Sequence, residues 1–170
     1  MFGKVKSLQE LFEIELRYAY DCEKKLTEKG LPSMIEAASS PELRAALEQH
    51  LEESRTHVTR LEQIFNSLGI EPDTKGNDII DKMMSAAKDS ASNIEDIPLR
   101  DAALIANGNV VEHYEIALYG SLASFARSLG MQNAVLPLEL TLKEEKAADA
   151  KLTQIAETAM NLRAARQTAR

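Results

Sequence analysis

Two glutamates inside an apolar helical stretch are the feature that most constrains how this sequence can fold. The stretch from Val110 to Tyr119 lies in a long segment that otherwise has the pattern of a buried helix. One face of that helix is apolar at both ends and acidic in the middle; it comprises Ile105, Gly108, Glu112, Glu115, Tyr119 and Leu122. Glutamate is almost never fully buried unless it is paired or bound to a metal, and two glutamates one turn apart repel each other. The helix must therefore turn its glutamates to solvent or place them around a proton or a cation.

Long helical patterns with clear start and stop signals make up most of the remaining sequence. Ser7-Leu8-Gln9-Glu10 is a capping box, Ser40-Pro41 is an N-cap followed by a first-turn proline, and Gly69 and Gly130 are typical helix ends. These signals predict four long helices and one short helical turn. The long helices cover residues 8–29, 41–68, 99–129 and 133–166, the first ending at Gly30, and the short turn covers 31–38.

The link between the second and third long helices is too long for a tight hairpin. Its turn sequences flank a weaker amphipathic helix, which we predict over residues 78–91. A link of this kind fits a crossover that runs along a helical bundle. We therefore expect an all-α fold, a four-helix bundle whose long crossover carries an extra short helix. The expected organisation is a single domain over residues 1–170, with a basic C-terminal tail from about residue 161.

The composition excludes several classes of function. A net charge of −7 argues against a general nucleic-acid binder, which is normally basic. No apolar run approaches the roughly 20 residues needed to span a membrane, and no signal-peptide pattern is present. The single cysteine, Cys22, cannot form an internal disulfide and suits a reducing compartment. We expect a cytoplasmic protein that binds neither nucleic acid nor membrane.

Each predicted long helix carries acidic residues about halfway along an apolar stripe. There is also a weak internal repeat, because a shift of 92 residues maps Glu23 onto Glu115, Glu53 onto Glu145 and His57 onto Asp149. Packing the four stripes together would bring these side chains to a common centre. The predicted metal ligands are Glu23, His50, Glu53, Glu112, Glu115, Glu145 and Asp149.

Carboxylates combined with imidazole favour iron or manganese over metals that prefer thiolates. Di-iron sites in helical bundles use a glutamate from each of two helices and Glu-x-x-His from the other two. This sequence departs from that pattern, since its second helix offers His50-x-x-Glu53 or Glu53-x-x-x-His57. His57 fits a ligand or a surface histidine equally well, and His50 is expected nearer the metal because it shares a row with Glu53. We predict two iron ions, with manganese as the alternative.

Several motifs resemble those of the bacterial YciF-type ferritin-like proteins, and the resemblance covers nearly the whole chain. The motifs are Tyr20-Asp21-Cys22-Glu23-Lys24-Lys25-Leu26, Ser39-Ser40-Pro41-Glu42-Leu43, His50-Leu51-Glu52-Glu53, Arg100-Asp101-Ala102-Ala103-Leu104-Ile105-Ala106, Val111-Glu112-His113-Tyr114-Glu115-Ile116-Ala117 and Glu144-Glu145-Lys146-Ala147-Ala148-Asp149. The resemblance implies a rubrerythrin-like bundle, a homodimer and an association with bacterial stress responses. Like its relatives, the chain lacks a rubredoxin-like Cys-x-x-Cys site, which argues against electron delivery from within the chain and leaves the electron donor unidentified.

Two functions of different classes are consistent with these features. The first is a di-metal redox protein that oxidises iron with peroxide or oxygen, or removes peroxide. The second is a structural or stress-protective bundle whose inherited metal site is not catalytic. Metal content, and the reaction of the ferrous protein with peroxide, would distinguish the two.

Overall fold

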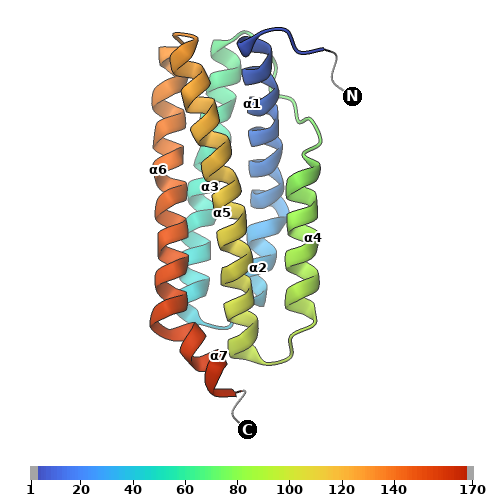
Figure 1. Ribbon diagram of the computed structural model, residues 1–170, viewed down its shortest axis with the longest axis vertical. Coiled ribbons are helices and arrows are strands. Elements are labelled where there is room, and N and C mark those ends of the chain that lie inside the picture. The colour runs from blue at the N-terminus through green and yellow to red at the C-terminus, as the bar shows by residue number, and fades with distance from the viewer. Residues whose placement is uncertain (1–3, 168–170) are drawn as a thin grey trace.

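The computed structural model describes residues 4–167, which form a bundle of long helices without any strand in that range. The elements are α1 (Leu8–Lys25), η1 (Leu26–Gly30), α2 (Leu31–Ala37), α3 (Pro41–Ser67), α4 (Asp78–Ser92), α5 (Ile97–Ser128), α6 (Gln132–Ile155), η2 (Ala156–Met160) and α7 (Asn161–Gln167). Figure 1 shows α1 and α6 running in one direction and α3 and α5 in the other. Helix α5 packs against α1 and α6, and α3 packs against the same two helices. The all-α four-helix bundle with a long crossover is confirmed.

Polar caps set the helix starts, and glycines end two of the helices. Ser7 accepts a hydrogen bond from the backbone N–H of Glu10, and Ser40 accepts one from Leu43, as the sequence predicts. Asp96, which lies in the predicted break before the third long helix, caps α5 in the same way. Gly69 and Gly130 have φ values of 69° and 71°, a conformation that glycine adopts at little cost.

The first helix does not end at Gly30, so that prediction is wrong. The chain continues from α1 through the π-helical turn η1 directly into α2. Gly30 has a φ of −60°, and a Cβ there would lie 2.9 Å from the Leu26 side chain and 3.6 Å from Met84. This glycine therefore permits close packing rather than a helix stop. A second π-helical turn, η2, similarly joins α6 to α7.

Helix α4 lies outside the bundle, beside α5 (Figure 1). Its buried Ile80 faces the core, and buried Asn77 caps its first turn through bonds from Ile79 and Ile80. The Asn77 amide also donates to the Tyr18 carbonyl and to the Tyr114 hydroxyl, and its backbone N–H donates to Asp21. These bonds tie the start of the crossover helix to α1 and α5.

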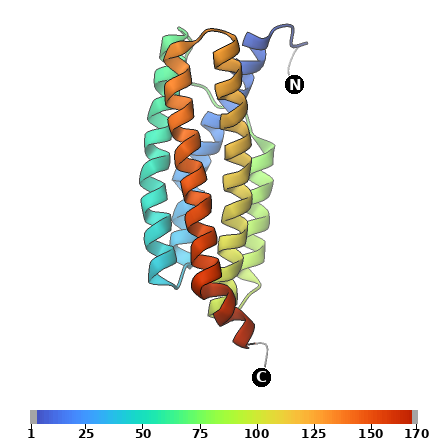
Figure 2. The same ribbon diagram turned by 60° about the vertical axis from the view of Figure 1, so that its left-hand side comes forward.

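Apolar side chains form two clusters at successive levels of the bundle. One includes Phe12, Phe65 and Leu122, and the other includes Leu47, Leu104 and Leu152. The middle of α5, from Glu112 to Glu115, lies between the two clusters along that helix. At Gly108 a Cβ would approach Leu152 to 2.9 Å, so this glycine allows α5 and α6 to come close just beside the acidic level. Both views show α5 and α6 side by side over most of their length (Figure 2).

No helix within residues 4–167 is sufficiently long and apolar to cross a membrane.

Candidate metal centre

Acidic and histidine side chains meet in the interior of the bundle, and α1, α3, α5 and α6 all contribute to them. These side chains are at most 5% exposed, and they are Glu23, His50, His57, Glu112, Glu115 and Glu145. Within residues 4–167 they form two groups whose potential ligand atoms lie within 4.8 Å of one another. We call His50, Glu112, Glu115 and Glu145 the His50 group, and Glu23, His57 and Glu145 the His57 group. Glu145 is thus common to both groups.

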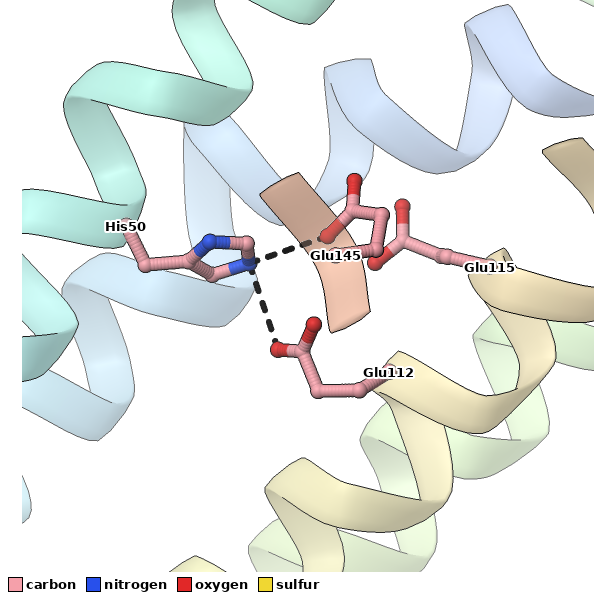
Figure 3. A group of neighbouring side chains, drawn as sticks. All are labelled: His50, Glu112, Glu115 and Glu145. Atoms are coloured by element: carbon pink, nitrogen blue, oxygen red, sulfur yellow. Dashed lines mark ion pairs between the residues drawn. The ribbon is translucent and has the colours of Figure 1, made fainter. Parts of the chain in front are cut away.

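The His50 group is held together by α3, α5 and α6 (Figure 3). His50 Nε2 lies 3.2 Å from Glu112 Oε1 and 3.7 Å from Glu145 Oε2. The carboxylates of Glu115 and Glu145 face each other in the figure. From α1, the Cys22 thiol donates to Glu115 Oε1 at 3.6 Å. Imidazole and carboxylate atoms therefore converge from different helices on a small volume.

The His57 group is more densely hydrogen-bonded. His57 Nδ1 lies 3.1 Å from Glu23 Oε1 and 2.9 Å from Glu145 Oε1. Because this nitrogen carries a single proton, it can satisfy one of these two oxygens at a time. The Tyr119 hydroxyl donates to Glu23 Oε1 at 2.6 Å. Glu145 therefore lies between the two histidines, with one oxygen toward each.

Glu144 and Arg60 hold the other edge of the His57 ring. His57 Nε2 lies 2.9 Å from Glu144 Oε2, and both guanidinium Nη atoms of Arg60 donate to the Glu144 carboxylate. Arg60 also donates to the Thr141 hydroxyl at 3.1 Å. With an N–H at Nε2 donating to Glu144, the Nδ1 lone pair can face a metal. A carboxylate that orients a ligating histidine in this way is a recurrent feature of metal sites.

Unpartnered polar atoms show that the buried carboxylates fit a cation. Each of the four buried glutamates keeps an oxygen without a hydrogen-bond partner: Glu23 Oε2, Glu112 Oε2, Glu115 Oε2 and Glu145 Oε2. The Nδ1 atom of His50 is likewise unpartnered. Buried polar groups are normally satisfied, and a buried charge needs a counter-charge. Carboxylate oxygen and imidazole nitrogen together suit iron or manganese.

Proton affinities at the centre show the same crowding of negative charge. Burial, followed by the charges of Glu145, Glu23 and Glu112, raises the pKa of Glu115 well above its usual range. Burial and the charge of Glu23 raise the pKa of Glu145 to about 7, although its hydrogen bond with His57 opposes the rise. The metal-free centre therefore holds protons that a bound cation would displace.

The histidines are affected in the opposite sense to ordinary buried histidines. Burial alone would lower the pKa of His57, but the hydrogen bonds with Glu145 and Glu23 and the charges of these carboxylates raise it to about 10. The pKa of His50 is raised well above its usual value against the effect of burial, chiefly by Glu112 and Glu53. Without metal, both histidines act as positive partners of the carboxylates.

Comparison with known proteins places this arrangement in a family. Residues 7–165 match the family model described as a domain of unknown function, DUF892. The chain belongs to the DUF892 family. It is also 37% identical over 164 residues to Protein YciF of Escherichia coli strain K12, an alignment that covers 94% of this chain and 96% of that protein. This match confirms the YciF-type family that the sequence motifs resemble.

Solved structures that are similar to this chain have the same helical architecture. The stress protein YciF of E. coli matches with a TM-score of 0.87 at 36% identity, covering 92% of this chain and 99% of that one. YcfI from Rhodopseudomonas palustris, described as a candidate structural protein, matches with a TM-score of 0.86 at 40% identity, covering 90% and 98%. A protein from Xanthomonas campestris shares the fold at 22% identity, with a TM-score of 0.72 and coverage of 96% and 99%.

Two of the predicted ligands of this DUF892 chain lie outside the His50 and His57 groups. Asp149 Oδ1 accepts a hydrogen bond from Asn109 at 2.6 Å and lies 3.2 Å from His113 Nδ1, so the predicted convergence of Asp149 on the centre is wrong. Glu53 lies at the edge, where it is 32% exposed and its Oε2 is 3.6 Å from His50 Nδ1. Its other oxygen accepts from Gln49. Glu23, His50, Glu112, Glu115 and Glu145 lie together as the sequence predicts.

Three side chains in or beside the centre were not among the predicted ligands. His57, which the sequence left open between ligand and surface residue, is fully buried and touches the buried Glu23 and Glu145, so both histidines reach the cluster. Glu144 directly precedes the predicted ligand Glu145 and lies three residues after Thr141 on the same helix. The thiol of Cys22, a lone cysteine that carries no ligand motif, contacts Glu115. Tyr20, from the motif that contains Glu23, bonds Glu62 outside the centre.

Proposed function

We propose that the centre binds two transition-metal ions, iron or manganese, and that the protein is a ferritin-like redox protein of the stress response. The observation that carries this proposal is the position of Glu145, one oxygen of which faces His50 while the other faces His57. The residues that would hold one ion are Glu23, His57 and Glu145. Those that would hold the other are His50, Glu112, Glu115 and Glu145.

Charge balance supports two cations over protons alone. Four buried carboxylates face two imidazoles in the described centre, so the acids exceed the bases even when both histidines are protonated. Buried glutamates of like charge cannot all be ionised without a cation between them. Two divalent ions would provide that compensation and release the protons held by Glu115, Glu145 and the histidines.

Bound iron would supply one-electron chemistry, and the protein's own groups orient the side chains that would hold it. The Tyr119 hydroxyl donates to Glu23 Oε1 at 2.6 Å and orients that carboxylate. Glu144, 27% exposed, lies 2.9 Å from His57 Nε2 and connects that ring to the solvent side of α6. With these groups, we propose that the centre oxidises ferrous iron with peroxide or oxygen. The electrons for any repeated turnover come from a separate donor.

A structural or stress-protective bundle is the second candidate function. It is favoured by the relative from R. palustris, which is described as a candidate structural protein. In this alternative the site is inherited and either holds metal without turnover or holds none. The homodimer that the family resemblance implies stays a prediction, which light scattering on the purified protein would check.

The experiment that separates the two functions begins with the metal content of the purified full-length protein. The protein is then loaded anaerobically with two ferrous equivalents and mixed with hydrogen peroxide in a stopped-flow spectrophotometer. We expect ferric absorbance to develop much faster than in a matched sample of free ferrous ion. Metal bound without accelerated oxidation would favour the structural alternative, and no bound metal would contradict the di-metal proposal itself.

A further inference from the structure

A cavity of about 240 Å³ lies between α3 and α6 and extends to the candidate metal centre. Its inner wall includes the buried side chains of His50 and Glu112. Its outer wall includes exposed Lys151 and half-buried Ala148 and Glu53. The cavity thus joins solvent to the His50 group through the gap between two helices.

Two nine-tenths-buried side chains face this cavity with unpartnered polar atoms. His50 is 5% exposed and its Nδ1 lacks a hydrogen-bond partner, and Glu112 is 3% exposed with Oε2 unpartnered. An apolar occupant would leave these buried polar atoms unsatisfied, which is unfavourable. Water can bond to either atom, and a hydrated cation can in addition compensate the negative charge of Glu112.

Glu53 lies between solvent and the buried part of the cavity. Its carboxylate is 32% exposed, its Oε2 is 3.6 Å from His50 Nδ1, and its Oε1 accepts a hydrogen bond from exposed Gln49. The 3.6 Å separation is an ion-pair contact that is longer than a hydrogen bond, so Glu53 is held less tightly than the buried glutamates. Together, Glu53 and Glu112 give the cavity two carboxylates, with Lys151 at its mouth and His50 at its inner end as the basic residues.

The approach from the opposite side of the centre is covered by paired side chains. There His57 is fully buried and its outer edge is covered by Glu144, which pairs with Arg60, and Arg60 also donates to the Thr141 hydroxyl. A cation approaching from that side would have to break the Arg60–Glu144 ion pair and would meet the guanidinium charge first. The acidic cavity is the route of lower electrostatic cost.

We propose that this cavity is the port through which divalent cations enter and leave the centre, with Glu53 as a transient ligand on the way to His50 and Glu112. This inference rests on the proposed metal centre. It adds that the His50 group loads from solvent and that the His57 group loads through it. Glu53 affects the rate of loading, whereas the buried glutamates determine how many ions are held.

The test measures cobalt(II) uptake by the metal-free full-length protein, followed by stopped-flow absorbance, with the final stoichiometry determined separately. Ala148→Phe narrows the cavity from α6, and Ala150→Phe is its control because Ala150 is exposed on the same helix and does not line the cavity. Glu53→Gln removes the carboxylate at the mouth. Glu52→Gln is its control, since exposed Glu52 loses the same charge one residue away and pairs with Arg55 instead.

We expect Ala148→Phe to slow uptake about tenfold with unchanged final stoichiometry, because entry then requires local opening of the helices. Glu53→Gln should slow uptake by roughly tenfold at low ionic strength, an effect that salt reduces. Both controls should match the wild type. Wild-type uptake rates in both Ala148→Phe and Glu53→Gln would overturn the proposed port. If Ala148→Phe does not fold, equal uptake rates in Glu53→Gln and Glu52→Gln are sufficient to overturn it. A wild-type protein that binds no cobalt would instead contradict the metal centre itself.

Discussion

The His57 group and the His50 group share Glu145 but differ in what surrounds them. Around His57, both ring nitrogens have carboxylate partners, Tyr119 donates to Glu23, and Arg60 holds Glu144 against the ring. Around His50, Nδ1 is unpartnered, a cavity adjoins the ring, and the contact from Cys22 to Glu115 is a weak thiol bond. One group is closed and fixed, and the other is accessible and loosely held.

This difference indicates a division of roles within one centre. A fixed histidine with an oriented ring keeps its geometry before metal binds, as preorganised sites require. A histidine beside a cavity can exchange its partners as ions enter and leave. The four predictions that follow test the division, beginning with the side chain that both groups share.

Removing the shared carboxylate should have the largest effect. We expect Glu145→Gln to weaken binding of both ions by more than about 100-fold, because loss of an outer partner of a ligand alone costs 10–100-fold. The metal-free variant should be no less stable than the wild type, since one buried negative charge is gone. Isothermal titration with manganese measures the first effect and urea unfolding the second.

The control for that variant is Glu139→Gln. Glu139 is exposed on the same helix as Glu145, α6, and pairs with Arg127 of α5. The control variant should bind manganese like the wild type. Two ions bound at unchanged affinity by Glu145→Gln would show that the two groups do not depend on a common ligand.

The two histidines should differ in their effect on the metal-free protein. His57→Ala leaves Glu23 and Glu145 without their buried positive partner, and should cost about 3 kcal/mol of unfolding free energy. His50 lies beside the cavity, where water can reach Glu112, so His50→Ala should cost only about 1 kcal/mol of unfolding free energy. Chemical denaturation of both variants in chelator measures this order. A larger loss for His50→Ala would reverse the assignment of the closed and accessible sides.

Metal-free protein should lose stability as the pH rises from about 5 to about 9. Glu145 has a folded-state pKa of about 7 against an ordinary 4.5, and His57 has about 10 against 6.5. A group whose pKa is raised by folding stabilises fully below its unfolded pKa, and this contribution is lost as the pH rises through the folded value. Both groups therefore act in the same direction over this range.

Melting temperatures from differential scanning fluorimetry, with and without saturating manganese, would check this dependence. The metal-loaded protein should show the smaller decline, because the ions replace the protons. A metal-free melting temperature that rises steadily from pH 5 to 9 would contradict the crowding of charge at the centre.

The smallest expected effect concerns single hydrogen bonds on the two sides. Tyr119→Phe removes a 2.6 Å bond to Glu23, and should cost the metal-free protein about 1 kcal/mol. Cys22→Ala removes a 3.6 Å thiol contact to Glu115, and should cost less. Urea unfolding of the two variants gives the comparison. Equal losses would remove the distinction between a tightly and a loosely bonded side.

Helical periodicity was sufficient to predict that Glu23, Glu112, Glu115 and Glu145 face the interior, but not the level of each acidic residue along the bundle. Glu145 and Asp149 lie four residues apart on one face, and that spacing corresponds to a rise of about 6 Å along the helix. The relative axial position of α5 and α6 depends on close packing, such as that of Gly108 against Leu152. That packing puts Asp149 level with Asn109 and His113, away from the centre.

Local chemistry also gave the wrong role for Gly30 and left the role of His57 undecided. A glycine after a helical pattern usually indicates a helix end, but Gly30 is needed for its close contact with Leu26, which only the folded chain reveals. His57 lies one turn after Glu53 on the same face of α3, but its carboxylate partners come from α1 and α6, and the sequence of α3 alone does not reveal them. Caps and inner stripes, in contrast, depend on near neighbours in sequence, and those predictions were confirmed at Ser7, Ser40, Gly69 and Gly130.

The central claim, a pair of metal ions sharing Glu145, is tested most directly by anomalous diffraction from crystals of the full-length protein grown with manganese. The account predicts two interior peaks roughly 3.5–4 Å apart, as in other two-metal sites. One should lie among Glu23, His57 and Glu145, and the other among His50, Glu112, Glu115 and Glu145. Interior density without an anomalous signal, or peaks confined to the surface of the bundle, would contradict it.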